Sequence, residues 1–270
     1  MSITDKFSKR HGFHEITEAP ITVRNDAPYD LRGVIVDIAY EFGFTPRSLR
    51  DLVCRVLRTR PDQDNWSEYP NIDNELRQLL DECDWFYVYD VLEAIAYQVP
   101  RLSREKTEEE FHDEMNMYFM RHGIGWKLVN GLLSYRGDEG LERILSNAVT
   151  AQNMTQHQTA ANELHEAIKD MSRRPNPDTT GVIQHAMASL ECVARDVSGS
   201  KDTLGDWIKK NDNAFPKPID DVIKKLWGFT SEHGRHLKES HEATLEEAEL
   251  VLGLSATLGS YLAQKHQSMI

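Results

Sequence analysis

The residues best suited to chemistry lie close together near the C-terminal end of the chain, in the stretch SEHGRHLKESH at residues 231–241. Four of its last nine positions are histidine or arginine, namely His233, Arg235, His236 and His241. Cleavage of RNA without a metal requires a base for the 2′-hydroxyl proton, an acid for the leaving oxygen and a cation beside the phosphate. Imidazoles that titrate near neutrality and a guanidinium supply all three. The residue types therefore suit acid–base cleavage of RNA.

The spacing of these residues constrains the backbone that must position them. At about 100° per residue, Arg235 and His241 would lie about 240° apart on one straight helix and would not converge. Thr244 is followed three residues later by Glu247, which is the capping-box pattern at the start of a new helix. We therefore expect a helix to end or bend between Arg235 and His241, with His241 in the connecting loop.

Two other interpretations of this stretch stay open. Arg235 can pair with Glu239 one turn later on a solvated helix end, where histidines are favoured by the helix C-terminus alone. Three histidines could also hold zinc, but no pattern of acidic and histidine ligands accompanies them. We expect neither a bound metal nor a cofactor.

A second basic feature is the predicted helix from Pro46 to Arg60. Its apolar residues occupy one side of a helical wheel, and its arginines gather on the other. These are Arg47, Arg50, Arg55 and Arg58. Four arginines on one face can bind phosphate groups, whereas the alternative is a solvated face beside acidic neighbours.

The elements that must position these groups are almost all helical. The exceptions are a short stretch, Ile21–Val23, and the segment from Ile124 to Tyr135, where Asn130-Gly131 between two apolar runs predicts a β-hairpin. Apolar periodicity and helix breakers predict the helices. Their ranges are about 30–42, 46–58, 72–81, 85–98, 108–121, 139–151, 159–172, 179–197, 204–210 and 219–229, followed by a last helix after Thr244. We expect Pro46, Pro61, Pro70 and Pro100 to mark breaks.

Length and composition bound the fold class and the environment. A chain of 270 residues with 40% hydrophobic residues folds into two modest domains, which we expect at residues 1–137 and 138–270. The predicted fold is mainly α: an N-terminal helical domain with a small β-hairpin and a C-terminal domain made of helices. Three scattered cysteines and no long apolar run favour a soluble cytoplasmic protein. The net charge of −13 requires any nucleic-acid contact to use a local basic patch.

Several runs of sequence resemble a known group of proteins. The opening ITDKFSKRHGF, the segment NWSEYPNI and the hairpin HGIGWKLVNG resemble the N-terminal domains of AbiJ-like abortive-infection proteins. The stretch DTTGVIQHAMASLECVARDVSG, with SEHGRHLKESH and the closing helix, resembles the helical HEPN domain that is attached to them. Together these runs touch most of the chain.

The resemblance implies a four- to five-helix HEPN unit, dimerisation that brings two motifs together, and metal-independent ribonuclease activity in phage defence. Its catalytic pattern is an arginine followed after four to six residues by a histidine, which Arg235, His236 and His241 match. The resemblance also puts the ECVARD helix beside this motif, where Glu191 or Arg195 could orient a histidine. The residues themselves favour an ordinary ion pair between Glu191 and Arg195, one helical turn apart.

The leading hypothesis is therefore an anti-phage ribonuclease whose N-terminal domain senses infection or regulates the nuclease. The expected partners are RNA as substrate, a second copy of the chain and a regulatory or antitoxin protein, but not a membrane. The competing hypothesis is a noncatalytic HEPN module that dimerises and binds a partner protein or nucleic acid.

Overall fold

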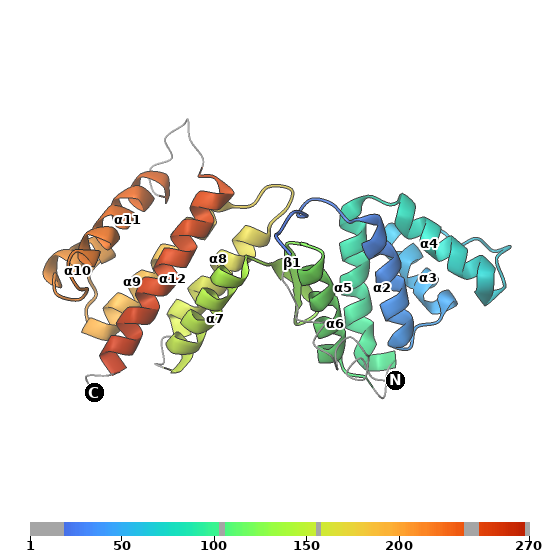
Figure 1. The fold of residues 1–270 in the computed structure, drawn as a ribbon, viewed down its shortest axis with the longest axis horizontal. Helices are drawn as coiled ribbons and strands as arrows, with labels where there is room; N and C mark the ends of the chain where they lie inside the picture. The colour runs from blue at the N-terminus through green and yellow to red at the C-terminus, as the bar shows by residue number, and fades with distance from the viewer. Residues whose placement is uncertain (1–18, 103–105, 155–157, 235–242, 268–270) are drawn as a thin grey trace. The chain divides into compact units, whose positions relative to one another are not determined.

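The computed structural model describes residues 19–102, 106–154, 158–234 and 243–267 (Figure 1). These ranges contain eleven α-helices and one two-stranded hairpin, which confirms the predicted mainly α fold class. Their contacts divide the chain into two units, Met1–Arg136 and Gly137–Ile270. No helix within these ranges has the length and apolar content needed to cross a bilayer.

Unit 1 forms a hydrophobic core from its helices, with a hairpin after the last of them (Figure 1). The elements are α2 (Tyr29–Glu41), α3 (Pro46–Leu57), α4 (Asp73–Glu82), α5 (Trp85–Leu102), α6 (Glu108–Arg121), β1 (Trp126–Val129) and β2 (Leu132–Tyr135). Phe42 and Phe111 meet edge to face in this core, with ring centroids 5.2 Å apart. The expected break at Pro100 is wrong, because α5 continues to Leu102. A proline in the last turn removes only one backbone hydrogen bond and so leaves the end of the helix intact.

The hairpin turns at the predicted dipeptide. The strands are antiparallel, with Trp126 opposite Tyr135 and Val129 opposite Leu132. Asn130 and Gly131 both have positive φ, at 50° and 78°, as a type I′ turn requires. Because few residues other than asparagine and glycine adopt this conformation at low cost, the sequence Asn-Gly fixes the register of the strands.

The residues just before the hairpin hold the start of the described chain in place. The amides of Thr22 and Val23 both donate to the Gly123 carbonyl oxygen, at 2.9 and 3.1 Å, and Val23 forms a parallel bridge with Ile124. Gly123 has a φ of 62°, and a Cβ on it would collide with the Pro20 carbonyl oxygen. Gly123, the first glycine of HGIG, is therefore required for the close approach of these two segments.

Gly123→Ala is expected to destabilise unit 1 by about 2 kcal/mol, because it combines a left-handed backbone with a backbone collision. Gly33→Ala is the matched control: this residue lies in α2, and its added Cβ would meet only the far end of Arg77, at 3.9 Å. That control should be neutral or slightly stabilising. Urea unfolding of both variants measures the difference, and equal stability of the two would contradict the assignment.

Unit 2 consists of helices throughout its described part (Figure 1). They are α7 (Glu139–Met154), α8 (Gln158–Ser172), α9 (Thr179–Ser198), α10 (Leu204–Lys210), α11 (Ile219–Gly234) and α12 (Leu245–Gln267). α9 is central, because α8, α10, α11 and α12 all contact it. Asp178 caps its first turn by accepting from the Gly181 amide at 2.8 Å, and Gly199 ends it with a φ of 64°.

Candidate functional site

The candidate catalytic residues Arg235, His236 and His241 lie outside the described residues, in the segment 235–242. The described chain flanks this segment with α11, up to Gly234, and α12, from Leu245. The predicted capping box at the start of α12 is confirmed. The Thr244 amide donates to a Glu247 carboxylate oxygen at 2.8 Å, and the Glu247 amide donates to the Thr244 hydroxyl at 3.2 Å.

Glu191 and Arg195 on α9 form the ion pair that the residues favour, with Arg195 Nη2 2.6 Å from Glu191 Oε1. Both side chains also bind the backbone that follows α9. Glu191 accepts from the Leu204 amide at 2.8 Å, and Arg195 Nε donates to the Asp202 carbonyl oxygen at 2.8 Å. The pair therefore fastens the start of α10 to α9.

His185 lies in a charged cluster at the corner between α8 and α9. Its Nδ1 is 2.7 Å from Glu163 Oε2, and its Nε2 is 3.5 Å from Asp170 Oδ2. Arg173 bridges the buried Asp170, at 2.9 Å, and the helix cap Asp178, at 2.8 Å. Each imidazole nitrogen of His185 thus faces a carboxylate. The cluster connects α8 to α9 and stabilises the turn between them.

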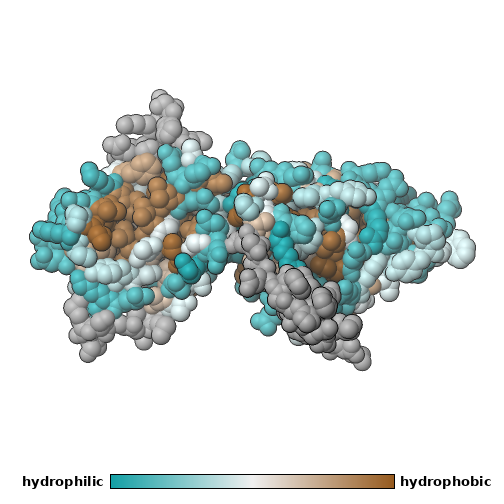
Figure 2. Space-filling model, in the orientation of Figure 1, coloured by the Kyte–Doolittle hydropathy of each residue, from teal (hydrophilic) through white to brown (hydrophobic). Residues whose placement is uncertain are grey.

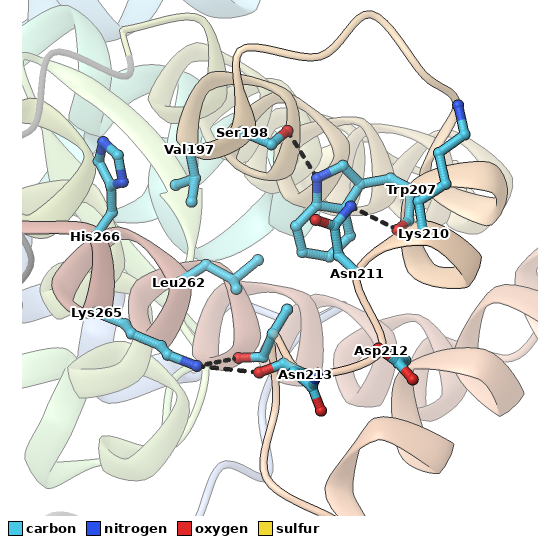
Figure 3. A pocket seen from close by; sticks show the side chains of 11 residues that line it. Val197, Ser198, Trp207, Lys210, Asn211, Asp212, Asn213, Leu262, Lys265 and His266 are labelled. Atoms are coloured by element: carbon cyan, nitrogen blue, oxygen red, sulfur yellow. Dashed lines mark hydrogen bonds between the residues drawn. The ribbon is translucent and has the colours of Figure 1, made fainter.

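A pocket of about 390 Å³ lies in unit 2 between the ends of α9, α10 and α12 (Figure 3). The Lys265 ammonium donates to the carbonyl oxygens of Asn213 and Ala214, at 3.3 and 2.8 Å. The indole of Trp207 donates to the Ser198 hydroxyl at 2.8 Å. Lys265 and Trp207 thus use these donors in hydrogen bonds within the protein, where they connect segments that line the pocket.

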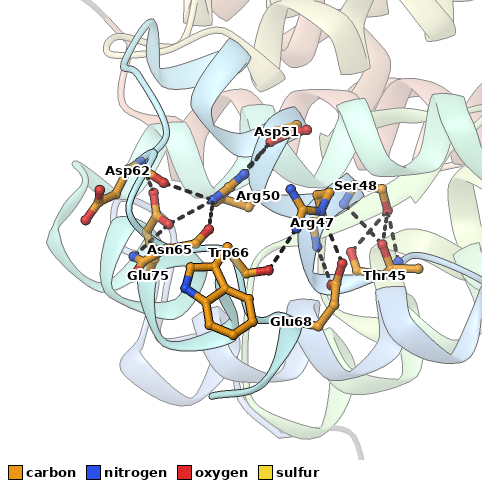
Figure 4. Close-up of polar contacts among 10 residues, drawn as sticks. All are labelled: Thr45, Arg47, Ser48, Arg50, Asp51, Asp62, Asn65, Trp66, Glu68 and Glu75. Carbon is orange, nitrogen blue, oxygen red and sulfur yellow. Dashed lines mark hydrogen bonds and ion pairs between the residues drawn. The ribbon is translucent and has the colours of Figure 1, made fainter. Parts of the chain in front are cut away.

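The four arginines predicted to share one face of α3 have different surroundings, and Figure 4 shows those of Arg47 and Arg50. Arg50 is only 5% exposed, so it does not belong to a solvent-facing phosphate site. Its guanidinium lies 3.1 Å from both Asp51 and Glu75. Arg47 is partly exposed and pairs with Glu68 at 3.3 Å. The side chains of Arg55 and Arg58 are exposed and have no ion pair or hydrogen bond with any residue that the structure describes.

Arg50 and Glu75 organise the loop that follows α3 (Figure 4). Glu75 accepts from the Asp62 amide at 2.6 Å and from the Asn65 side chain at 3.0 Å. Arg50 reaches the carbonyl oxygens of the same two residues, at 3.4 and 3.5 Å. Burial alone would raise the pKa of Glu75, but these hydrogen bonds and the Arg50 ion pair hold it below its ordinary range.

Glu75→Gln is expected to destabilise unit 1 by about 2 kcal/mol near neutral pH, because it leaves the buried Arg50 with one carboxylate fewer. The folded-state pKa of Glu75 is lowered, so its contribution is complete above the unfolded pKa of about 4.3 and is lost as the pH falls through the folded pKa. The difference in the free energy of unfolding between the parent and Glu75→Gln should therefore become smaller at acidic pH. Urea unfolding between about pH 7 and about pH 3 measures this. Asp64→Asn, at an exposed acid in the same loop, is the control and should leave the stability unchanged.

Sequence reasoning did not assign a role to Trp66, which this network presents to solvent (Figure 4). The Trp66 carbonyl oxygen accepts from Arg47 Nη2 at 3.0 Å, yet the residue is 78% exposed. Its sequence signal is a tryptophan inside the polar, proline-flanked run NWSEYP, where no apolar periodicity requires burial.

The geometry offers no metal centre in the described ranges, because no three histidine, cysteine or acidic side chains gather there in a suitable group.

A model of the family described as AbiJ N-terminal domain 4 matches residues 5–151, more than half of the 270-residue chain. Comparison with curated proteins and with solved structures gives no match. An AbiJ-related domain indicates a role in abortive infection, a form of defence. The chain therefore belongs to the AbiJ N-terminal domain 4 family.

Proposed function

We propose that the chain is an anti-phage protein whose C-terminal unit is a HEPN-type, metal-independent ribonuclease regulated by the N-terminal unit. The observation that carries the proposal is the place of the RHLKESH motif. It joins α11 to α12 in a unit whose described elements are all helices and which follows an AbiJ-type domain. The match continues to residue 151, inside α7, so the AbiJ-type sequence runs directly into the helical unit.

The proposed roles follow from the chemistry of the side chains. Arg235 places a fixed positive charge beside the scissile phosphate, where negative charge grows in the transition state. His236 is the main acid–base group: with its copy in the second motif of a homodimer, one imidazole takes the proton of the 2′-hydroxyl and the other protonates the leaving 5′-oxygen, while His241 has a supporting role in catalysis. No metal takes part in this scheme.

A homodimer is part of the proposal, because one motif offers few groups for a base, an acid and a phosphate clamp. The two helices that flank the motif expose large apolar side chains, among them Val222 on α11 and Leu250 on α12, which is 61% exposed. Figure 2 shows a hydrophobic area over these helices. Apolar area of this kind favours association, and a twofold axis would pair two motifs.

The test uses purified protein and cells. The proposal expects the purified chain to cleave a mixed pool of cellular RNA in EDTA, and induction of the chain to halt growth. Absence of both activities, also during phage infection, would favour the noncatalytic dimerisation and interaction module. A regulatory or antitoxin protein, if one silences the chain, should restore growth when it is produced together with it.

A further inference from the structure

Trp66 is highly exposed although the loop that carries it is held in place by several side-chain contacts. Single exposed apolar side chains are common on protein surfaces. Trp66, however, is the most exposed of the large apolar side chains in the described residues, at 78%. Its loop is held by the buried Arg50 and the largely buried Glu75, and such an ion pair stabilises a fold only when its geometry is well satisfied.

The anchors fix the backbone on both sides of the indole (Figure 4). Glu75 and Arg50 bind the chain at Asn65, just before Trp66. Arg47 binds the Trp66 carbonyl oxygen, and its amide and guanidinium both reach Glu68, at 3.0 and 3.3 Å. A ring on such a backbone binds a ligand without the entropy cost of ordering the loop.

A stripe of arginines begins beside this ring. Arg47 and Arg55 lie about 80° apart on the exposed side of α3, over a length of about 12 Å, and Arg58 follows the end of the helix as its left-handed C-cap, with a φ of 56°. Asp51 lies in the same stripe, but its charge is paired with Arg50 at 3.1 Å. Arg55 and Arg58 lack an acidic partner throughout the described ranges. Arg55 and Arg58 therefore provide two cations that can bind anions, whereas Arg47 of the stripe is already paired with Glu68.

We propose that Trp66 and the stripe Arg47, Arg55 and Arg58 bind single-stranded RNA, with a base stacked on the indole and phosphates against the arginines. Aromatic rings beside basic grooves bind single strands in this way, and a duplex would not offer an unstacked base. Because the chain carries a net charge of −13, attraction must come from this local stripe and not from the overall field. That the strand is RNA rests on the proposed ribonuclease function, for which this site in unit 1 would recruit substrate.

The test measures binding apart from cleavage. The probe is a fluorescein-labelled, mixed-sequence single strand of 2′-O-methyl RNA, which lacks the nucleophile needed for cleavage. Fluorescence anisotropy with the full chain is expected to show salt-sensitive binding. Trp66→Ala should weaken it by about tenfold, because one base loses its stacking partner, and Trp66→Phe should retain most of it.

The matched control is Tyr29→Ala, which removes another aromatic side chain of unit 1 that is 73% exposed. It should leave affinity unchanged, and thermal melts should show that all variants stay folded. The double variant Arg55→Ala/Arg58→Ala should weaken binding and reduce the slope of log affinity against log salt by about 1 to 2. A DNA strand of the same sequence shows whether the site uses only stacking and phosphate contacts.

Two results would overturn the inference. One is a parent chain that binds no single strand, which would also be the outcome if Trp66 served a protein partner. The other is a Trp66→Ala variant that binds as tightly as the parent. The proposed ribonuclease is judged separately, because binding without any cleavage removes that function and leaves the site, whereas cleavage with Trp66-independent binding removes only the site.

Discussion

Arg235→Ala and His236→Ala are each expected to reduce RNA cleavage by about a hundredfold or more and to remove growth toxicity. Arg235 supplies the only charge in the proposed scheme that is fixed at all pH values, and loss of one acid–base imidazole costs about this factor. His241→Ala should have a smaller effect, because His241 is farther from the adjacent pair in sequence. Single-turnover cleavage of labelled RNA measures all three.

The control for this series is Lys238→Ala, which removes a charge within the same stretch but is not part of the proposed machinery. It should keep the parental rate. Thermal melts alongside separate lost chemistry from lost fold. Parental rates for Arg235→Ala and His236→Ala would show that this motif is not the active site.

Leu250→Asp is expected to convert a homodimer into a monomer and to reduce cleavage by about a hundredfold. A charge at this exposed apolar position of α12 would have to be desolvated in an apolar interface, which is unfavourable by several kcal/mol. If two motifs form one site, loss of the dimer removes part of the catalytic groups at once. Light scattering at micromolar concentration, with a cleavage assay on the same sample, tests both effects.

The control is Leu132→Asp, which places the same charge at an exposed apolar position of the unit 1 hairpin. It should leave the dimer and its activity unchanged. A parent chain that is monomeric and still cleaves RNA would contradict the paired site, as would a monomeric Leu250→Asp variant with full activity.

The elements whose signals are local were predictable from the sequence. Asn130-Gly131 specifies its turn because both residues tolerate positive φ, and Thr244 with Glu247 specifies a helix start because each side chain satisfies the other's amide. Glu191 and Arg195 are one turn apart, so their ion pair follows from helical geometry alone. In each case the partners lie within a few residues of one another.

The surroundings of side chains that meet distant parts of the chain were not predictable. A helical wheel puts Arg50 with the exposed arginines, but its partner Glu75 lies 25 residues away and draws it into the interior. Leu250 on α12 is an apolar side chain that the other described helices leave uncovered, which depends on how the helices pack. The exposure of the Trp66 indole was likewise not predictable, because it depends on contacts that residues of α3 and α4 make with the loop.

The central claim, RNA cleavage by protein acid–base groups alone, is tested most directly by the products of one reaction. End-labelled RNA is incubated with the purified chain in EDTA, beside the same strand with 2′-O-methyl groups. We expect only the unmodified strand to be cut and its products to end in 2′,3′-cyclic phosphates, because the 2′-oxygen attacks the phosphate. Cleavage that requires a divalent metal, or cleavage of the 2′-O-methyl strand, would contradict the account.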